Sequence, residues 1–104
     1  MKKYFLIVAL LAPLMSVTAI AGCVADVPPK LPDGNTVTED EMRESVRAIR
    51  SYITKNEAYL ACLDKDKRSG HWKTNTKHYN AMVDEMKRVG ASFNTELKLF
   101  KLRQ

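Results

Sequence analysis

The sequence is poor in the residues from which most active sites are built. It contains two histidines, two cysteines and four glycines in 104 residues. They form no glycine-rich phosphate loop, no CxxC pair and no metal-ligand spacing. No internal repeat is present, and no segment after residue 21 alternates with the two-residue period of a strand. These absences argue against an enzyme, a resident cofactor, a small-molecule substrate and a β-sheet fold.

The few residues with chemical potential are poorly placed for chemistry. His71 and His78 are seven residues apart and share one face of a helix, but no further ligands accompany them at metal-binding spacing. Cys62 has His71 as its nearest histidine in the sequence and no group to orient that base. Asp84 and Glu85 are adjacent, so they point to different helix faces. We therefore expect no metal site and no catalytic residue.

The first 21 residues have the three-part organisation of a secretory signal peptide. Lys2 and Lys3 precede an apolar run at residues 5–21, which ends in the small residues Ala19 and Ala21. A membrane span needs about 20 apolar residues, and this run is short for one. Cleavage after residue 21 predicts an exported protein, with the periplasm as its expected location. The mature chain is too small to bury a large core, so it needs a covalent staple or a partner.

Charge is unevenly distributed along the chain, which carries a net charge of +5. Residues 22–64 hold five Lys and Arg against eight Asp and Glu, whereas residues 65–104 hold ten against four. A cluster of cations around one tryptophan, here called the basic tip, consists of Lys65, Lys67, Arg68, His71, Trp72, Lys73 and Lys77. Such a cluster can bind anionic headgroups, lipopolysaccharide phosphates or an acidic partner. The alternative, which the usual burial of tryptophan favours, is a solvated turn with Trp72 folded back over the helix ends.

Residues 22–38 are expected to form an extended arm. Pro28 and Pro29 exclude regular helix and favour polyproline-type backbone, and the sequence Pro32-Asp33-Gly34 is typical of a turn. Two interpretations are equally consistent with this pattern: a flexible tether, or an ordered strap that lies along the helices.

A long amphipathic helix is predicted over residues 39–68. Its apolar stripe repeats at steps of four and three and consists of Met42, Val46, Ile49, Ile53, Asn56, Leu60 and Leu63. Thr38 is a suitable N-cap, and Glu41 three residues later completes a capping box. Gly70 is a candidate C′ residue. Asn56 interrupts the stripe, where it either sets the register or, as we favour, lies at the stripe edge in contact with water.

A second helix is predicted over residues 75–102, with its cap among residues 74–77. Its stripe slips in phase near Phe93, so it is not a strict heptad; it consists of Tyr79, Met82, Met86, Val89, Phe93, Leu97 and Phe100. Gly90 lies mid-helix at a cost of about 1 kcal/mol relative to Ala, which indicates a close approach to the first helix or a kink. A short link between two helices favours an antiparallel hairpin.

The predicted fold is therefore all-α: an antiparallel two-helix hairpin, residues 39–104, with an extended Pro-rich N-terminal arm. Two helices leave apolar surface exposed, so a homodimer that forms a coiled-coil-like four-helix bundle is a candidate assembly.

Cys23 and Cys62 admit two interpretations. An even cysteine count permits an intramolecular disulfide in an exported protein. However, the segment 20–23 (Ile-Ala-Gly-Cys) also fits a lipobox, which would make Cys23 the lipidated first residue of an outer-membrane lipoprotein. We expect the disulfide, because the helix rises about 35 Å from Glu39 to Cys62 and the extended arm reaches about 50 Å. Closing this loop would contribute about 4 kcal/mol to stability.

Short motifs are distributed over most of the mature chain, at Cys23, Pro28-Pro29, Leu31-Pro32-Asp33-Gly34, Met42, Tyr59-Leu60-Ala61-Cys62-Leu63, Tyr79-Asn80 and Phe93-Asn94. In these motifs the chain resembles a loose group of small exported proteobacterial helical proteins of unknown function. The resemblance implies a helical exported protein in which the two cysteines belong together. It implies no activity and no catalytic residue.

The leading functional hypothesis is a non-enzymatic exported envelope protein that acts by protein–protein interaction, with a second copy or another envelope protein as its partner. The main alternative is a binder of anionic membrane surface through the basic tip. A further alternative is a lipoprotein anchored at Cys23. Nucleic acid is not an expected partner, because export separates the protein from it.

Overall fold

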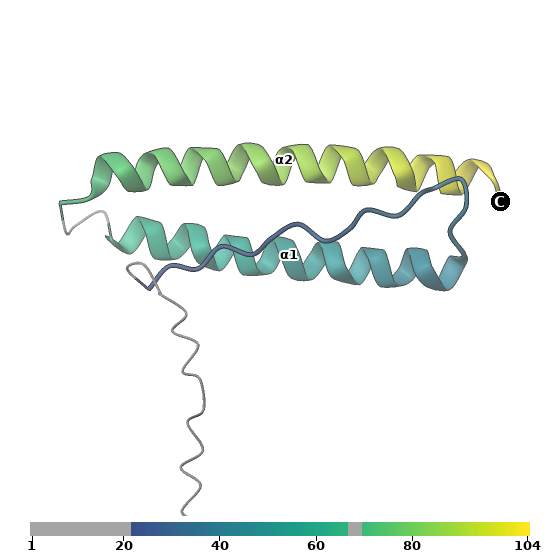
Figure 1. The fold of residues 1–104 in the computed structure, drawn as a ribbon, viewed down its shortest axis with the longest axis horizontal. Coiled ribbons are helices and arrows are strands. Elements are labelled where there is room, and N and C mark those ends of the chain that lie inside the picture. The colour runs from purple at the N-terminus through teal and green to yellow at the C-terminus, as the bar shows by residue number, and fades with distance from the viewer. Residues whose placement is uncertain (1–21, 67–69) are drawn as a thin grey trace, which may run out of the picture.

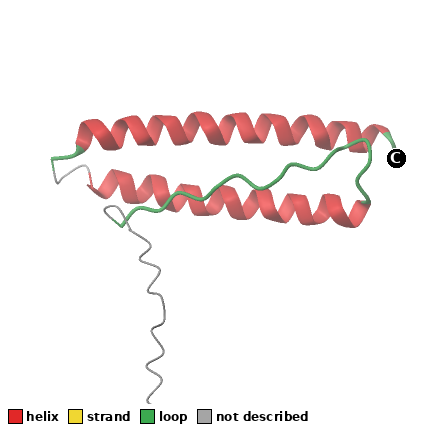
Figure 2. Cartoon of the chain, viewed as in Figure 1, coloured by secondary structure: helices red, strands yellow, loops and turns green. Residues whose placement is uncertain are grey.

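Two long antiparallel helices make up the body of the protein (Figure 1). The computed structural model describes residues 22–66 and 70–104. Helix α1 spans Glu39–Asp66 and helix α2 spans Trp72–Leu102. The regular structure in the described residues is entirely helical (Figure 2), which confirms the predicted all-α hairpin. The predicted signal peptide, residues 1–21, lies outside the described residues.

The arm, residues 22–38, runs along the hairpin for nearly its whole length (Figure 1). It begins beside the end of α1, which we call the tip end, and reaches the start of α1, which we call the far end. Cys23 is bonded to Cys62 with the two Cα atoms 5.5 Å apart, so the predicted disulfide is confirmed. Leu31 and Val37 of the arm pack against the core. The arm is therefore an ordered strap rather than a free tether.

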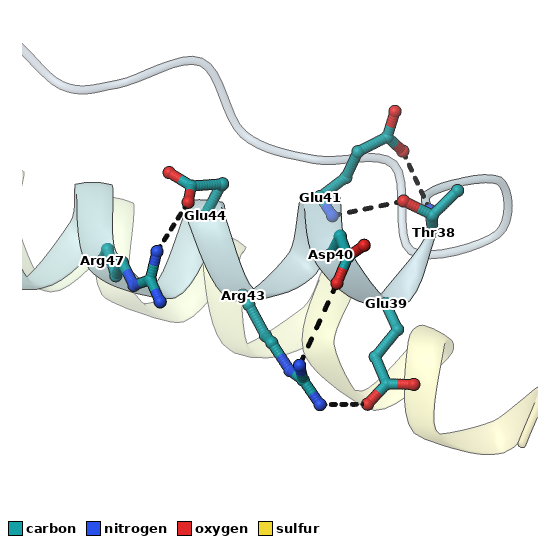
Figure 3. A network of polar contacts seen from close by, with 7 residues as sticks. All are labelled: Thr38, Glu39, Asp40, Glu41, Arg43, Glu44 and Arg47. Carbon is teal, nitrogen blue, oxygen red and sulfur yellow. Dashed lines mark hydrogen bonds and ion pairs between the residues drawn. The ribbon is translucent and has the colours of Figure 1, made fainter.

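The first turn of α1 is stabilised by groups close in sequence (Figure 3). The Thr38 backbone N–H donates to Glu41 Oε2 at 2.8 Å, and the Glu41 N–H donates to Thr38 Oγ1 at 3.2 Å. These two bonds form the predicted capping box. The acidic side chains pair within the helix, because Arg43 contacts Glu39 at 2.6 Å and Asp40 at 3.9 Å. All of these ion-paired groups are exposed, so each pair contributes little.

The tip end departs from the expected helix boundaries. Helix α1 ends at Asp66, and α2 begins at Trp72, three residues before the predicted start at Asn75. His71 occupies the N-cap position without a side-chain capping bond. Gly70 has a φ of +88°, but it precedes α2 rather than directly following α1. The prediction placed Asn75 among the caps because its side chain is typical of one, whereas the structure buries it against α1.

The core lies between the two helices along most of their length. Its buried apolar side chains come from both helices and from no strand, and they are Met42, Ile49, Tyr52, Leu63, Val89, Phe93 and Phe100. Val46, Ile53, Met86 and Leu97 are only partly buried against this cluster. Compared with the predicted apolar stripe, the buried residues of α1 are therefore shifted around the helix toward Tyr52, which lies on the side that the arm covers.

The structure contradicts our expectation that Asn56 lies at the stripe edge in contact with water. Its side chain is fully buried, with an exposed fraction of 0%. Its Oδ1 accepts from the Asp26 backbone N–H at 2.9 Å, and its Nδ2 donates to the Asp26 carbonyl at 3.3 Å. The side-chain amide therefore pairs with both polar groups of one peptide position in the arm, much as a neighbouring strand would. This pairing fixes the register of the arm on α1.

The arm crosses to α2 at the far end, where Gly34 is buried. The Gly34 N–H donates to Glu96 Oε2 at 2.7 Å, and Arg103 donates to the carbonyls of Gly34 at 3.1 Å and Val37 at 2.9 Å. A Cβ at position 34 would collide with the backbone carbonyl of Glu96 and lie 2.9 Å from Leu99 Cβ. Glycine is required here by this close approach of two backbones.

Gly90 marks neither a kink nor a close approach to α1, the two roles that the sequence suggested. Helix α2 runs unbroken through it (Figure 1), and a Cβ at this position would meet nothing within 4 Å. A glycine that costs about 1 kcal/mol relative to Ala therefore has no packing reason within the described chain.

Replacing Thr38 with Ala should lower the free energy of unfolding by about 1 kcal/mol, because it removes one capping bond and leaves the Glu41 N–H unpaired. Urea denaturation followed by circular dichroism measures this difference. Thr54→Ala, at an exposed position in the middle of α1, is the matched control and should not destabilise the protein. Equal loss in both variants would contradict a role for the cap.

Replacing Asn56 with Ala should cost about 1–3 kcal/mol of stability, because the partly buried N–H and carbonyl of Asp26 lose their partners. The variant should also speed proteolysis between residues 24 and 33, as the arm loosens while the disulfide still holds its end. Asn80→Ala, at an exposed position on α2, should change neither quantity. Parent-like proteolysis of Asn56→Ala would show that this amide does not hold the arm.

Candidate functional site

A pocket opens at the tip end, where the arm, α1 and α2 meet. It has a volume of about 390 Å³ and is lined by Cys23, Ala25, Tyr59, Leu63, Asp66, His71, Thr74, Asn75 and His78. Ligand pockets commonly have volumes of about 300–1,000 Å³, so this one can accept one or two apolar side chains of a partner. We refer to it as the tip-end pocket.

Asn75 and the disulfide hold the pocket open in a defined shape. Asn75 Nδ2 donates to Asp66 Oδ2 at 3.0 Å and to the Leu63 carbonyl at 3.5 Å, and this ties the first turns of α2 to the last turn of α1. The Cys23–Cys62 disulfide attaches the arm to α1 beside the pocket. A buried amide that bonds an orphan carbonyl at a helix end satisfies a group that would otherwise be unpaired.

The structure describes five of the seven residues of the basic tip. His71 lines the pocket, whereas Lys65, Lys73 and Lys77 are exposed on the helix surfaces around it. Lys67 and Arg68 lie outside the described residues. Of the five residues of the basic tip that the structure describes, His71 is the one that lines the pocket.

Trp72 corrects the expectation that it folds back over the helix ends. It is the first residue of α2 and remains 55% exposed. The ammonium of Lys73 lies 5.5 Å from the centre of its ring, which is within cation–π range. The helix starts earlier than predicted, and this start directs the indole into solvent rather than across the hairpin.

Both histidines line the pocket, with His71 at the N-cap position and His78 within α2. In the part of the chain that the structure describes, no group of three or more His, Cys, Asp or Glu is placed to hold a metal ion. Sequence reasoning missed Ala25, Tyr59 and Thr74 as pocket residues. No motif marks them, because they meet only when the arm is fastened to α1.

Tyr52 is the buried polar group with the least obvious role. Its exposed fraction is 1%, and its hydroxyl has no hydrogen-bond partner among the described residues. Burial raises the pKa of this phenol above its usual range; Glu85 and Asp26 add to the rise, and Arg88 opposes it. Tyr52 therefore stays a neutral phenol at physiological pH and acts as a packing residue rather than as a base or nucleophile.

Comparisons with models of protein families, with curated proteins and with solved structures found no match to this chain. Neither of the two described helices contains a stretch apolar enough to span a bilayer.

The disulfide competes directly with lipidation of Cys23. A sulfur atom bonded to Cys62 Sγ cannot also carry a thioether to a lipid, so each molecule holds one modification or the other. The structure has the disulfide form, and no free cysteine is present in the described residues.

Intact mass of protein from the native host should correspond to a chain that begins at Gly22 and gains two hydrogens on reduction. Reduction followed by alkylation should label two thiols, and alkylation without reduction should label none. A mature chain that begins at Cys23 with added acyl mass, and in which Cys62 alkylates without reductant, would contradict the staple.

Proposed function

We propose that this chain is a non-enzymatic exported protein that acts by binding another protein. The observation that carries the proposal is the exposure of Trp72, at 55%, in the first turn of α2. Tryptophan usually buries most of its surface, and it is enriched in the centres of protein interfaces. The solvent-exposed indole of Trp72 is therefore the proposed contact residue for a partner protein.

The frame behind Trp72 is well suited to binding. The disulfide and the Asn75–Asp66 bond restrain the tip end before a partner arrives. Groups that are ordered in advance lose less conformational freedom on association, so more of the contact energy appears as affinity. The tip-end pocket lies at the same end and offers an apolar recess for a partner side chain.

Export is supported by two independent features. The first is the basic and apolar leader at residues 1–21. The second is the Cys23–Cys62 disulfide, because disulfides persist in oxidising compartments such as the periplasm. The periplasm is therefore the proposed location, and a free envelope protein is preferred to one anchored at Cys23.

The second candidate function is binding to an anionic membrane surface through the basic tip. The observation that favours it is the pairing of the exposed Trp72 ring with the Lys73 ammonium at 5.5 Å. Lys65 and Lys77 add further exposed cations at this end. An amphipathic ring surrounded by cations suits a headgroup layer, where the ring lies at the interface and the cations meet phosphates.

A photo-reactive amino acid in place of Trp72 should cross-link to one discrete protein in intact cells. The mass of the adduct identifies the partner as another protein or as a second copy of this chain. The same reagent in place of Thr54, an exposed α1 position away from the tip, is the control and should give no such adduct. Identical adduct patterns at both positions, or none at 72, would overturn the proposal.

Co-sedimentation with vesicles of anionic lipid tests the second candidate on the same protein. A membrane role requires binding that weakens as salt is raised and that is lost in Trp72→Ala. Absence of vesicle binding together with a discrete protein adduct favours the leading proposal, and the reverse pattern replaces it with the second.

A further inference from the structure

The hairpin has two broad faces, and the arm covers one of them. It contacts α1 at Asn56 and Cys62, and it contacts Glu96 of α2 and Arg103, the C-cap residue of that helix. Helical spacing places a second set of residues on the opposite, arm-free face. These residues are partly buried in the described structure, and they are Val46, Ile53, Leu60, Tyr79, Val83, Met86, Gly90 and Leu97.

The arm cannot move to cover this face. One end is fixed by the disulfide at Cys62, its middle by the Asn56 amide, and its far end by Glu96 and Arg103. An apolar row is therefore left with water on one side. Trp72 continues the same row by helical spacing, at the tip end of α2.

Gly90 is the first observation that bears on what binds to the apolar row of the arm-free face. It carries a cost of about 1 kcal/mol relative to Ala in a helix interior, and a Cβ at this position would meet open space in this chain. It lies between Met86 and Leu97 on the arm-free face. A glycine at such a position lets a large group from another molecule approach the helix backbone closely.

The charged edge of α1 identifies the other molecule as a second copy. Arg43, Arg50, Glu57 and Asp64 recur every seven residues along the outer edge of the arm-free face. When two α1 helices lie antiparallel, Arg50 of each copy meets Glu57 of the other, and Arg43 comes level with Asp64. A parallel arrangement would oppose like charges. The row is therefore complementary to itself in one orientation only.

The same two-fold axis gives Gly90 a partner. In the hairpin, Leu63 of α1 lies level with Asn75 of α2. An axis that crosses α1 midway between Arg50 and Glu57 therefore crosses α2 between Asp84 and Glu85. Equal rise along both helices then brings Gly90 of one copy opposite Tyr79 of the second, so a tyrosine ring meets the position that lacks a side chain.

We propose that this chain forms a two-fold dimer through the arm-free face, in which each α1 lies antiparallel to the other and the arms remain outside. The dimer is a four-helix bundle stapled on both outer faces. The inference rests on the proposed function, because it names a second copy of this chain as the protein that is bound.

Charge reversal tests the pairing without disturbing the fold, because Arg50 and Glu57 are both exposed. The parent protein, purified from cells that express the full gene, should have the mass of a dimer in light scattering. Arg50→Glu and Glu57→Arg should each raise the dimer dissociation constant about tenfold or more, and the double variant should restore it to within about threefold. Two copies of each pair make the effect large. A monomeric parent, or a double variant as weak as the singles, would overturn the proposal.

Gly90→Leu tests the close approach. Leucine is a better helix former than glycine and its Cβ meets open space in the single chain, so helix content and disulfide formation should stay as in the parent. The dimer should be lost. Ala91→Leu, at the exposed neighbouring position, is the matched control and should remain dimeric. Parent-like dimerisation of Gly90→Leu would exclude this interface.

The outcomes separate this inference from the function on which it rests. A monomeric protein that still gives a discrete adduct at position 72 with a different protein retains the proposed function and removes the dimer. A monomer without any adduct removes both. A dimer sensitive to Arg50→Glu and Gly90→Leu supports both.

Discussion

The disulfide between Cys23 and Cys62 is the constraint on which the arrangement of this chain depends. It closes a loop of 39 residues, which contributes about 4 kcal/mol when the loss of freedom in the unfolded chain is counted. That is a large share for a small protein whose stability is of the order of 5–15 kcal/mol. It also brings a proline-rich segment, which cannot pair with itself, against a helix that can satisfy its polar groups.

Once the arm is fastened, the two faces of the hairpin differ. On the covered face, polar side chains hydrogen-bond the backbone of the arm. Asn56 pairs with the N–H and carbonyl of Asp26, Glu96 accepts from the Gly34 N–H, and Arg103 donates to the Gly34 carbonyl at the far end. These bonds link residues 30 to 69 positions apart in sequence. The other face keeps its half-buried apolar row, and the tip end keeps an exposed tryptophan. The covered face therefore serves stability, and the open face and the tip are the surfaces on which the proposed association depends.

Whether a feature could be predicted from the sequence depended on how far apart in the chain the interacting residues lie. Thr38 and Glu41 are three residues apart, and their reciprocal bonds form where the pattern placed them. The two stripes specified two helices, and chain length alone showed that the arm could reach Cys62. Asn56 and Trp72 were misplaced, since burial of the first depends on the register of a distant arm, and exposure of the second depends on where α2 begins. Most of the tip-end pocket likewise could not be predicted from the sequence, because its lining residues Ala25, Tyr59 and Thr74 belong to three separate segments.

The sequence by itself determined the helices, the start of α1, the irregular arm and the capacity of the two cysteines to pair. These follow from local bonding, from the 3.6-residue period and from the length of an extended chain. Tertiary structure alone decided which face the arm covers, why packing within the chain requires a glycine at position 34 but not at position 90, and which residues surround the tip-end pocket. Those features depend on the rotation of each helix about its axis and on the register of the arm. Both are set by the combined packing of three segments, which no short stretch of sequence encodes.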